Sequence, residues 1–203
     1  MKFIVVFVIA LLIIKLFVVE IYKINQNSMS PTLKSENIVL VLKNFYSIKH
    51  GDIIIFENEN ENFIKRCVGL PGDEIKIING KIFINDALYL DYFECDYQLD
   101  AFKKSYIYNT YGTNWNTCDF GPYIIPKKNY SVDFNSELMK VYKSLLTFEN
   151  ITLIDPIDKR NFYRFKDNYY FFLGDNKRVS TDSRFYGPIK TSQIKGKVIL
   201  KIW

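Results

Sequence analysis

The chain has 203 residues, of which 48% are hydrophobic and 17% aromatic, and its formal net charge is +5. This length and composition support a full apolar core in one or two domains and exclude an intrinsically disordered protein. The Lys and Arg residues are scattered without a dense basic block, so nucleic acid is not an expected partner. One histidine and three cysteines without a Cys-x-x-Cys pair predict no metal site, and no cofactor is expected.

The N-terminal stretch from Phe3 to Val19 is apolar except for Lys15. At about 1.5 Å per residue, a helix of this length nearly spans the hydrocarbon core of a bilayer, and residues 20–23 can extend it to the interface. The alternative is a cleavable signal peptide. Because no small-x-small cleavage motif follows the apolar run, we predict an uncleaved membrane anchor over residues 1–24. Lysines flank both ends, so charge does not determine its orientation.

From Asn37 onward the pattern changes to β-branched residues with a period of two, which is typical of strands. The dipeptide Asn79-Gly80 between two such runs suits a type I′ hairpin turn. We therefore predict a mainly β protein built from antiparallel sheets. The expected strands are Ile38–Leu42, Ile53–Phe56, Phe63–Leu70, Glu74–Ile78, Lys81–Ile84, Tyr169–Leu173 and Lys197–Trp203.

The middle of the chain is less regular and divides the predicted β core into residues 25–86 and 166–203. The intervening residues 87–165 are predicted to form an α+β insertion. It contains one helical candidate, residues 136–148, whose apolar side chains recur on one face. We expect this helix to belong to the scaffold.

The three cysteines cannot all pair with one another. Cys67 lies within a predicted strand and is expected to be a small core residue. Cys95 and Cys118 form a disulfide if this part of the chain lies outside the cytoplasm, or else remain free thiols. The sequence leaves both alternatives open.

Ser28 is the candidate nucleophile. It begins the stretch Ser28–Leu33, in which Pro31 fixes its own backbone and pushes Ser30 toward an extended conformation. The alternative interpretation is structural, with Ser30 capping a short helix that has proline at its first position. A serine hydroxyl also needs a base before it becomes a nucleophile.

Lys65 is the candidate base. In the predicted strand Phe63–Leu70, alternation places Lys65 on the same face as Phe63 and Cys67, with Arg66 on the other face. A lysine between an aromatic ring and a thiol is desolvated, which lowers its pKa and frees the neutral amine to accept the serine proton. The alternative is a lysine at a sheet edge with its amine in water. The one histidine, His50, lies in the turn Lys49-His50-Gly51-Asp52, where nothing indicates a buried, carboxylate-oriented imidazole, and it is the weaker candidate base.

Four sequence blocks occur in a fixed order after the apolar segment. Their residues are Ser-Met-x-Pro-Thr-Leu, Gly-Asp-Ile-Ile-Ile-Phe, Ile-Lys-Arg-Cys-Val-Gly-Leu-Pro-Gly-Asp and Gly-Asp-Asn-x5-Asp-Ser-Arg-x-Tyr-Gly, and together they span residues 28–188. In this order they resemble the type I signal peptidases, which are membrane-anchored serine endopeptidases with a Ser–Lys dyad. The resemblance implies a barrel-like catalytic core of antiparallel sheets.

The resemblance also implies roles for individual residues. Ser28 matches the nucleophile and Lys65 the general base, whereas Ser30 falls at the variable position of its motif. Ser180 matches a hydroxyl that orients the lysine amine. Five further residues match a supporting loop: Gly174, Asp175, Asn176, Asp182 and Arg184. The expected ion pairs that stabilise this loop are Asp182–Arg184 and Arg66–Asp175.

The implied reaction is acyl transfer through a covalent acyl-enzyme. The backbone N–H of Ser28 is the first candidate to hold the oxyanion. Many members of the family have a second donor, a serine, two residues before the nucleophile. This chain has Gln26 there, so either its side-chain amide donates or the backbone acts alone. Family substrates are signal peptides with small residues at positions −1 and −3 before the cut.

The resemblance places the protein in the bacterial cytoplasmic membrane as a single-pass protein, in contact with lipid and with its catalytic domain on the extracytoplasmic side. The oligomeric state is left open. Three other functions are possible: a self-cleaving regulator, a pilus- or conjugation-type peptidase with one dedicated substrate, and an inactive anchored binding domain. A self-cleaving regulator requires an N-terminal DNA-binding helix-turn-helix. The N-terminus of this chain is instead the apolar segment.

Overall fold

The computed structural model describes residues 3–4, 17–44, 46–95, 101–133, 138–148 and 162–203. Most of the predicted anchor lies outside these residues. Within the described ranges, no helix is both long and apolar enough to cross a membrane. The predicted extension of the anchor helix over residues 20–23 is wrong, because these residues belong to strand β1 (Val19–Lys23). They pair antiparallel with β2 (Ile38–Leu42). Their backbone N–H and C=O groups therefore make hydrogen bonds to a neighbouring strand and not within a helix.

The larger sheet has seven strands in the order β1-β2-β13-β3-β4-β11-β12, and adjacent strands are antiparallel. The predicted strands are confirmed here with small shifts at their ends, and the short strand β12 was not predicted. Strand β4, which contains Lys65, lies between β3 and β11 in the interior of the sheet. The remaining bounds are β3 (Ile53–Asn58), β4 (Glu61–Gly69), β11 (Tyr169–Leu173), β12 (Ile189–Lys190) and β13 (Ile194–Lys201).

A second sheet has four strands in the order β7-β6-β5-β8. Asn79 and Gly80, with φ of 48° and 76°, connect β5 to β6, and both residues have the positive φ that a type I′ turn requires. Strands β7 and β8 come from the region predicted as an insertion and pair with β6 and β5. The bounds are β5 (Glu74–Ile78), β6 (Lys81–Ile84), β7 (Ala87–Leu90) and β8 (Phe120–Ile124).

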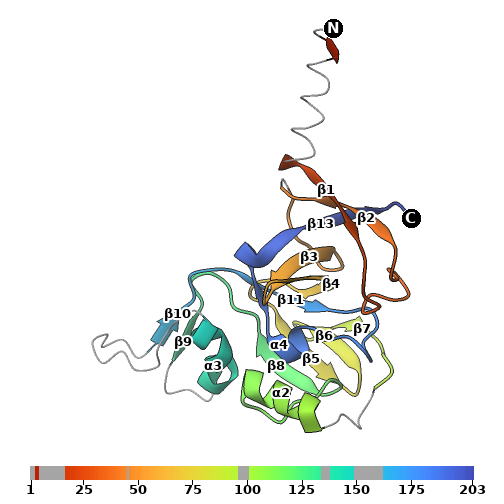
Figure 1. Ribbon diagram of the computed structural model, residues 1–203. Coiled ribbons are helices and arrows are strands. Elements are labelled where there is room, and N and C mark those ends of the chain that lie inside the picture. Colours follow the sequence, from red (N-terminus) through yellow and green to blue (C-terminus); the bar gives the residue numbers. More distant parts are fainter. Residues whose placement is uncertain (1–2, 5–16, 45, 96–100, 134–137, 149–161) are drawn as a thin grey trace.

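Two longer helices lie at the end of the molecule opposite β1 and β2 (Figure 1). Helix α3 (Leu138–Phe148) confirms the predicted helix, and Tyr142 and Leu145 on its apolar face are buried. Helix α2 (Ala101–Tyr111) was not predicted, because its apolar residues do not recur on one face. Shorter elements complete the fold: β9 (Ser131–Asp133), β10 (Phe162–Arg164), α4 (Ser183–Tyr186) and the 3₁₀ turn η1 (Thr191–Gln193).

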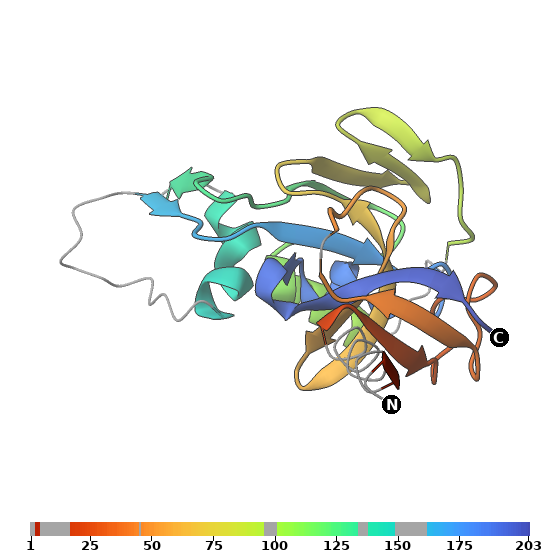
Figure 2. The same ribbon diagram turned by 90° about the horizontal axis from the view of Figure 1, so that it is seen from above.

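The apolar core has three clusters. The largest joins the second sheet to α2, α3 and β11, and it is rich in aromatic rings such as Tyr123 and Phe171. A second cluster lies under β1 and β2 and includes Met29 and Leu33 from the serine-containing stretch. The view from above shows the second sheet in yellow on one side of β11 and the strands of the β1–β2 end in orange on the other (Figure 2). Strand β11 contributes Phe171 to the largest cluster and Phe172 to the third cluster, so it lies between these two parts of the core.

The cysteines are free thiols. Cys67 is buried in the third cluster with Phe56 and Phe172, as expected for a core residue. Cys118 is buried in the largest cluster, and Cys95 packs against that cluster. Of the two alternatives for Cys95 and Cys118, the structure contains the free thiols.

Candidate active site

Ser28 lies at the start of a tight turn. The Leu33 N–H donates to the Met29 carbonyl at 2.9 Å, and the Ser30 N–H donates to the Asn27 carbonyl at 3.1 Å. No helix follows Ser30, so the helix-capping interpretation of this stretch is wrong. Met29 and Leu33 are buried in the core below the turn, whereas Ser28 is only partly buried. The buried side chains anchor the turn and leave the serine hydroxyl at the surface of the protein.

Lys65 meets Ser28 from the interior of the larger sheet. Its ammonium group, Nζ, donates to Ser28 Oγ at 2.8 Å and to the Ile64 carbonyl at 3.1 Å. The side chain is only 1% exposed, and Nζ lies 5.4 Å from the centroid of the Phe63 ring. The desolvated setting expected from strand alternation is therefore present, and the alternative of a solvated sheet-edge lysine is not.

Burial has a chemical consequence for Lys65. Removal from water disfavours the charged ammonium and lowers the pKa to about 8, although the negative charge of Asp182 partly opposes this. With a pKa near this value, roughly a tenth of the amine is neutral at pH 7. A neutral amine within hydrogen-bond distance of a serine hydroxyl can accept its proton.

Ser180 is also buried next to this pair. The Lys65 ammonium donates to other groups, and the Ser180 hydroxyl instead lies close enough to the Asp182 carboxylate to help lower the pKa of that acid. Ser180 packs tightly against Gly174: a methyl group at Gly174 would approach Ser180 Oγ to 2.2 Å and the Ser28 carbonyl oxygen to 2.5 Å. Gly174 therefore permits close contact between the supporting loop and the nucleophile.

The supporting loop fixes Ser28 through the backbone. The Asn176 N–H donates to the Ser28 carbonyl at 3.0 Å. The Asp175 carboxylate receives two hydrogen bonds from Arg66, at 2.8 and 2.6 Å, and one from the Thr32 hydroxyl. Burial raises the pKa of Asp175, but the bonds from Arg66 and Thr32 outweigh it, so the pKa lies below its usual value. The sequence analysis missed Thr32, although its place in the Ser-Met-x-Pro-Thr-Leu block was a usable signal.

A second ion pair braces the other end of this loop. Arg184 Nε and one terminal nitrogen each donate to the Asp182 carboxylate at 2.8 Å, and both side chains are 0% exposed. Asp182 also accepts the Gly174 N–H at 3.1 Å. Burial raises the pKa of Asp182, yet the Arg184 guanidinium outweighs this and holds it below its usual value. The same guanidinium donates to the Thr117 and Lys177 carbonyls, and Thr117 is another residue that sequence analysis missed.

A groove of about 360 Å³ lies beside the dyad. Gln26, the candidate oxyanion donor, lies in its wall and is exposed. Apolar walls come from Ile24, four residues before Ser28, and from Ile64, which directly precedes Lys65. The full lining is Tyr22, Lys23, Ile24, Asn25, Gln26, Ile55, Glu61, Asn62, Phe63 and Ile64.

His50 is not part of this arrangement. Its Nε2 atom lies 2.7 Å from the carboxylate of Asp73, in the turn that follows β4. That carboxylate also accepts from the Leu70 N–H and the Asn85 amide. The pair therefore stabilises a turn. Among the described residues, no group of three or more His, Cys, Asp or Glu side chains could hold a metal ion.

The geometry is that of a hydrolase in which the candidate nucleophile, a serine hydroxyl, is hydrogen-bonded to a buried lysine amine. Comparison with known proteins supports this class. The family model described as "Signal peptidase, peptidase S26" matches residues 1–203. The chain belongs to this family and is a serine peptidase.

Individual relatives agree with the family match. A signal peptidase I from Bacillus caldolyticus is 33% identical over 94% of this chain and 82% of that protein. A signal peptidase IB from Staphylococcus aureus is 30% identical, covering 95% of this chain and 82% of that protein. A signal peptidase I from Streptococcus pneumoniae is 27% identical over 89% of this chain and 80% of that protein.

Proposed function

We propose that this protein is a membrane-associated endopeptidase that removes N-terminal signal peptides from exported preproteins, with Ser28 as nucleophile and Lys65 as general base. The observation that carries the proposal is the 2.8 Å hydrogen bond between Lys65 Nζ and Ser28 Oγ, made by a lysine that is almost completely buried. Family membership and the names of the relatives support the substrate class.

In the proposed mechanism, the neutral Lys65 amine takes the proton of the Ser28 hydroxyl as the oxygen attacks the scissile carbonyl. The C–N bond then breaks, and the lysine ammonium returns its proton to the leaving amine. Water hydrolyses the resulting ester with Lys65 again as base. The Ser28 N–H is the first candidate donor to the oxyanion, and exposed Gln26 is the second.

The groove lined by Ile24 and Ile64 supports the expected substrate preference. Both side chains lie in its wall, and the Ile64 carbonyl accepts a hydrogen bond from Lys65 Nζ. A shallow apolar wall accepts alanine and excludes larger side chains by steric clash. Signal peptides with small residues at positions −1 and −3 fit this requirement.

Contact with the membrane is supported by the outer face of the β1–β2–β13 region. Ile21 pairs with Leu40, and Leu40 pairs with Leu200, so these three side chains form a row across the strands. Ile21 and Leu200 are 64% and 55% exposed. An apolar row of this kind suits a lipid surface. We propose that the catalytic domain lies on the extracytoplasmic side of the bacterial cytoplasmic membrane, where translocated preproteins emerge, and that residues 1–24 anchor it.

The experiment is a cleavage assay with the full chain in detergent or lipid. The substrate is a preprotein with Ala-x-Ala at its junction. We expect wild type to cut after the second alanine, and Ser28→Ala and Lys65→Ala to lower the rate by about 10³-fold or more. Ser30→Ala, two residues from the nucleophile, is the matched control and should retain activity.

Other outcomes lead to other functions. If wild type fails on several such preproteins, the general role is wrong, and a dedicated processing peptidase or an inactive binding domain replaces it. If Lys65→Ala stays active, Lys65 is not the base, and His50 has to be tested.

A further inference from the structure

The groove that contains Gln26 has an acidic end. Glu61 and Ile64 both belong to β4 and both line the groove. Ile64 directly precedes Lys65, and its carbonyl accepts a hydrogen bond from the lysine amine. Glu61 lies four residues before Lys65 on the same strand, and at about 3.3 Å per residue the two backbones are roughly 13 Å apart. None of the proposed catalytic steps uses Glu61.

The charged side chains that line the groove are Lys23 and Glu61. Lys23 forms an ion pair at 2.5 Å with Glu36, which does not line the groove. In the part of the chain that the structure describes, no basic side chain forms an ion pair with Glu61. The Glu61 side chain is also exposed. The groove therefore has an uncompensated negative charge at the end remote from Lys65.

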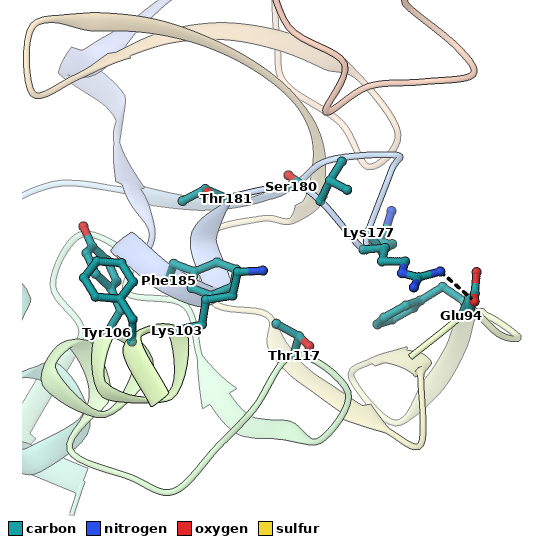
Figure 3. Close-up of a pocket in the computed structure, with 12 residues that line it drawn as sticks. Glu94, Lys103, Tyr106, Thr117, Lys177, Ser180, Thr181 and Phe185 are labelled. Carbon is teal, nitrogen blue, oxygen red and sulfur yellow. Dashed lines mark hydrogen bonds and ion pairs between the residues drawn. The ribbon is translucent and has the colours of Figure 1, made fainter. Parts of the chain in front are cut away.

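The acid of a separate cavity gives a contrast. Figure 3 shows this cavity, which is lined by Ser180 and shares no lining residue with the groove. Its acidic residue, Glu94, forms an ion pair with Arg178 at 3.0 Å, drawn there as a dashed line. A carboxylate that is already paired attracts a further cation only weakly. Glu61 has no such partner and can pair with a cation that the substrate supplies.

We propose that Glu61 selects substrates with a basic residue at position −4, −5 or −6, a role that rests on the peptidase function proposed above. Residues −1 and −3 are assigned to the apolar part of the groove, at Ile24 and Ile64. An extended chain that continues upstream reaches the level of Glu61 about four residues before residue −1. A lysine or arginine there forms an ion pair with the carboxylate. Because this position is remote from the scissile carbonyl, the ion pair is equally strong in the ground state and the transition state, so it lowers KM and leaves kcat unchanged.

The test is cleavage of preproteins that have the same Ala-x-Ala junction and differ only at position −5, where they carry lysine, glutamine or glutamate. The full chain is assayed in detergent as wild type, Glu61→Gln and Glu61→Lys. For wild type, KM should be about fivefold lower for the lysine substrate than for the glutamate substrate, with the same kcat. Glu61→Gln should abolish this difference, and Glu61→Lys should reverse it. A lysine at position +2, beyond the cut, should show no dependence on Glu61.

Glu59→Gln is the matched control. Glu59 is another exposed acid of the β3–β4 hairpin, but it does not line the groove. This variant should keep the wild-type preference, and an equal loss of preference in Glu59→Gln and Glu61→Gln would overturn the assignment to Glu61. Equal KM values of wild type for the lysine and glutamate substrates, or a preference that persists in Glu61→Gln, would overturn it as well.

A binding measurement separates this role from the proposed peptidase activity. Fluorescently labelled peptides with the same junctions are titrated with Ser28→Ala, and with the double variant Ser28→Ala, Glu61→Gln, by fluorescence anisotropy. The lysine peptide should bind Ser28→Ala about fivefold more tightly than the glutamate peptide, and the double variant should bind both equally. If wild type cleaves no preprotein but this difference is present, the peptidase function is wrong and the role of Glu61 in ligand selection is retained. Cleavage without any charge preference has the opposite meaning.

Discussion

Two buried basic side chains lie near the candidate nucleophile, and they differ in whether a carboxylate is their hydrogen-bond partner. Arg184 is 0% exposed and receives its countercharge directly from Asp182, through two hydrogen bonds of 2.8 Å. Lys65 is 1% exposed, but its hydrogen-bond partners are a neutral hydroxyl and a neutral carbonyl. The Asp182–Arg184 ion pair therefore stabilises the loop, whereas burial pushes Lys65 toward its neutral form.

The comparison shows that burial alone does not identify a reactive group. A buried charge with a bonded carboxylate is a structural feature, and removing one partner leaves the other uncompensated. A buried amine without such a partner destabilises the fold but has a pKa close to the working pH. Substitution of the two residues should therefore change stability in opposite directions.

The largest change in stability is expected for Arg184→Met. It leaves the Asp182 carboxylate buried and unpaired, which should lower the free energy of unfolding by about 3–5 kcal/mol in urea denaturation. Arg178→Met is the matched control on the same loop. Its ion pair with Glu94 is exposed, so the loss should be roughly 0–1 kcal/mol. Equal losses for the two variants would contradict the account.

Lowering the pH should remove the stabilisation that the Asp182–Arg184 ion pair provides. The folded pKa of Asp182 lies below its unfolded value, so the pair contributes stability above the unfolded pKa. That contribution is lost as the pH falls through the lowered folded pKa. Wild type should therefore lose more stability on acidification than the double variant Asp182→Leu with Arg184→Met, as measured by urea denaturation at each pH.

An increase in stability is expected for Lys65→Met. The folded pKa of about 8 lies below the unfolded value of 10.5, so the unfolded chain binds more protons between these values. Wild-type stability should rise with pH across this window. Below pH 8, the methionine variant should be more stable by up to about 3 kcal/mol, and it should lack the rise. Thermal or urea unfolding at pH 7 and pH 10 measures both effects, and a destabilised variant at pH 7 would refute them.

The smallest effect is expected for Ser180→Ala. Because the Lys65 ammonium bonds to Ser28 and the Ile64 carbonyl, loss of the Ser180 hydroxyl should lower kcat by at most about tenfold. KM should stay the same. A loss of a hundredfold or more would show that Ser180 holds the lysine amine in the working enzyme.

Local patterns were sufficient to predict much of the scaffold. Runs of β-branched and aromatic residues located β2, β3, β4 and β11, and Asn79-Gly80 marked the hairpin between β5 and β6. Strand β1 was missed because its apolar residues continue those of the predicted anchor, and only its pairing with β2 distinguishes it. Helix α2 has no apolar face that a sequence pattern could reveal.

The sequence predicted which side chains form the candidate site, but it did not predict the backbone hydrogen bonds that hold them. Alternation on β4 indicated a desolvated Lys65, and the sequence blocks associated it with Ser28 and the supporting loop. The hydrogen bond from the Asn176 N–H to the Ser28 carbonyl could not be predicted, because it joins backbone groups far apart in the chain. The same is true of the Arg184 bond to the Thr117 carbonyl.

The most direct test of the central claim is the pH dependence of kcat/KM for cleavage of an Ala-x-Ala preprotein by the full chain. If neutral Lys65 is the base, kcat/KM should rise about tenfold per pH unit and level off near pH 8, where the buried amine loses its proton. His50→Gln should leave this profile unchanged. A wild-type profile that does not level off near pH 8, or one that shifts in His50→Gln, would contradict the assignment of Lys65 as the base.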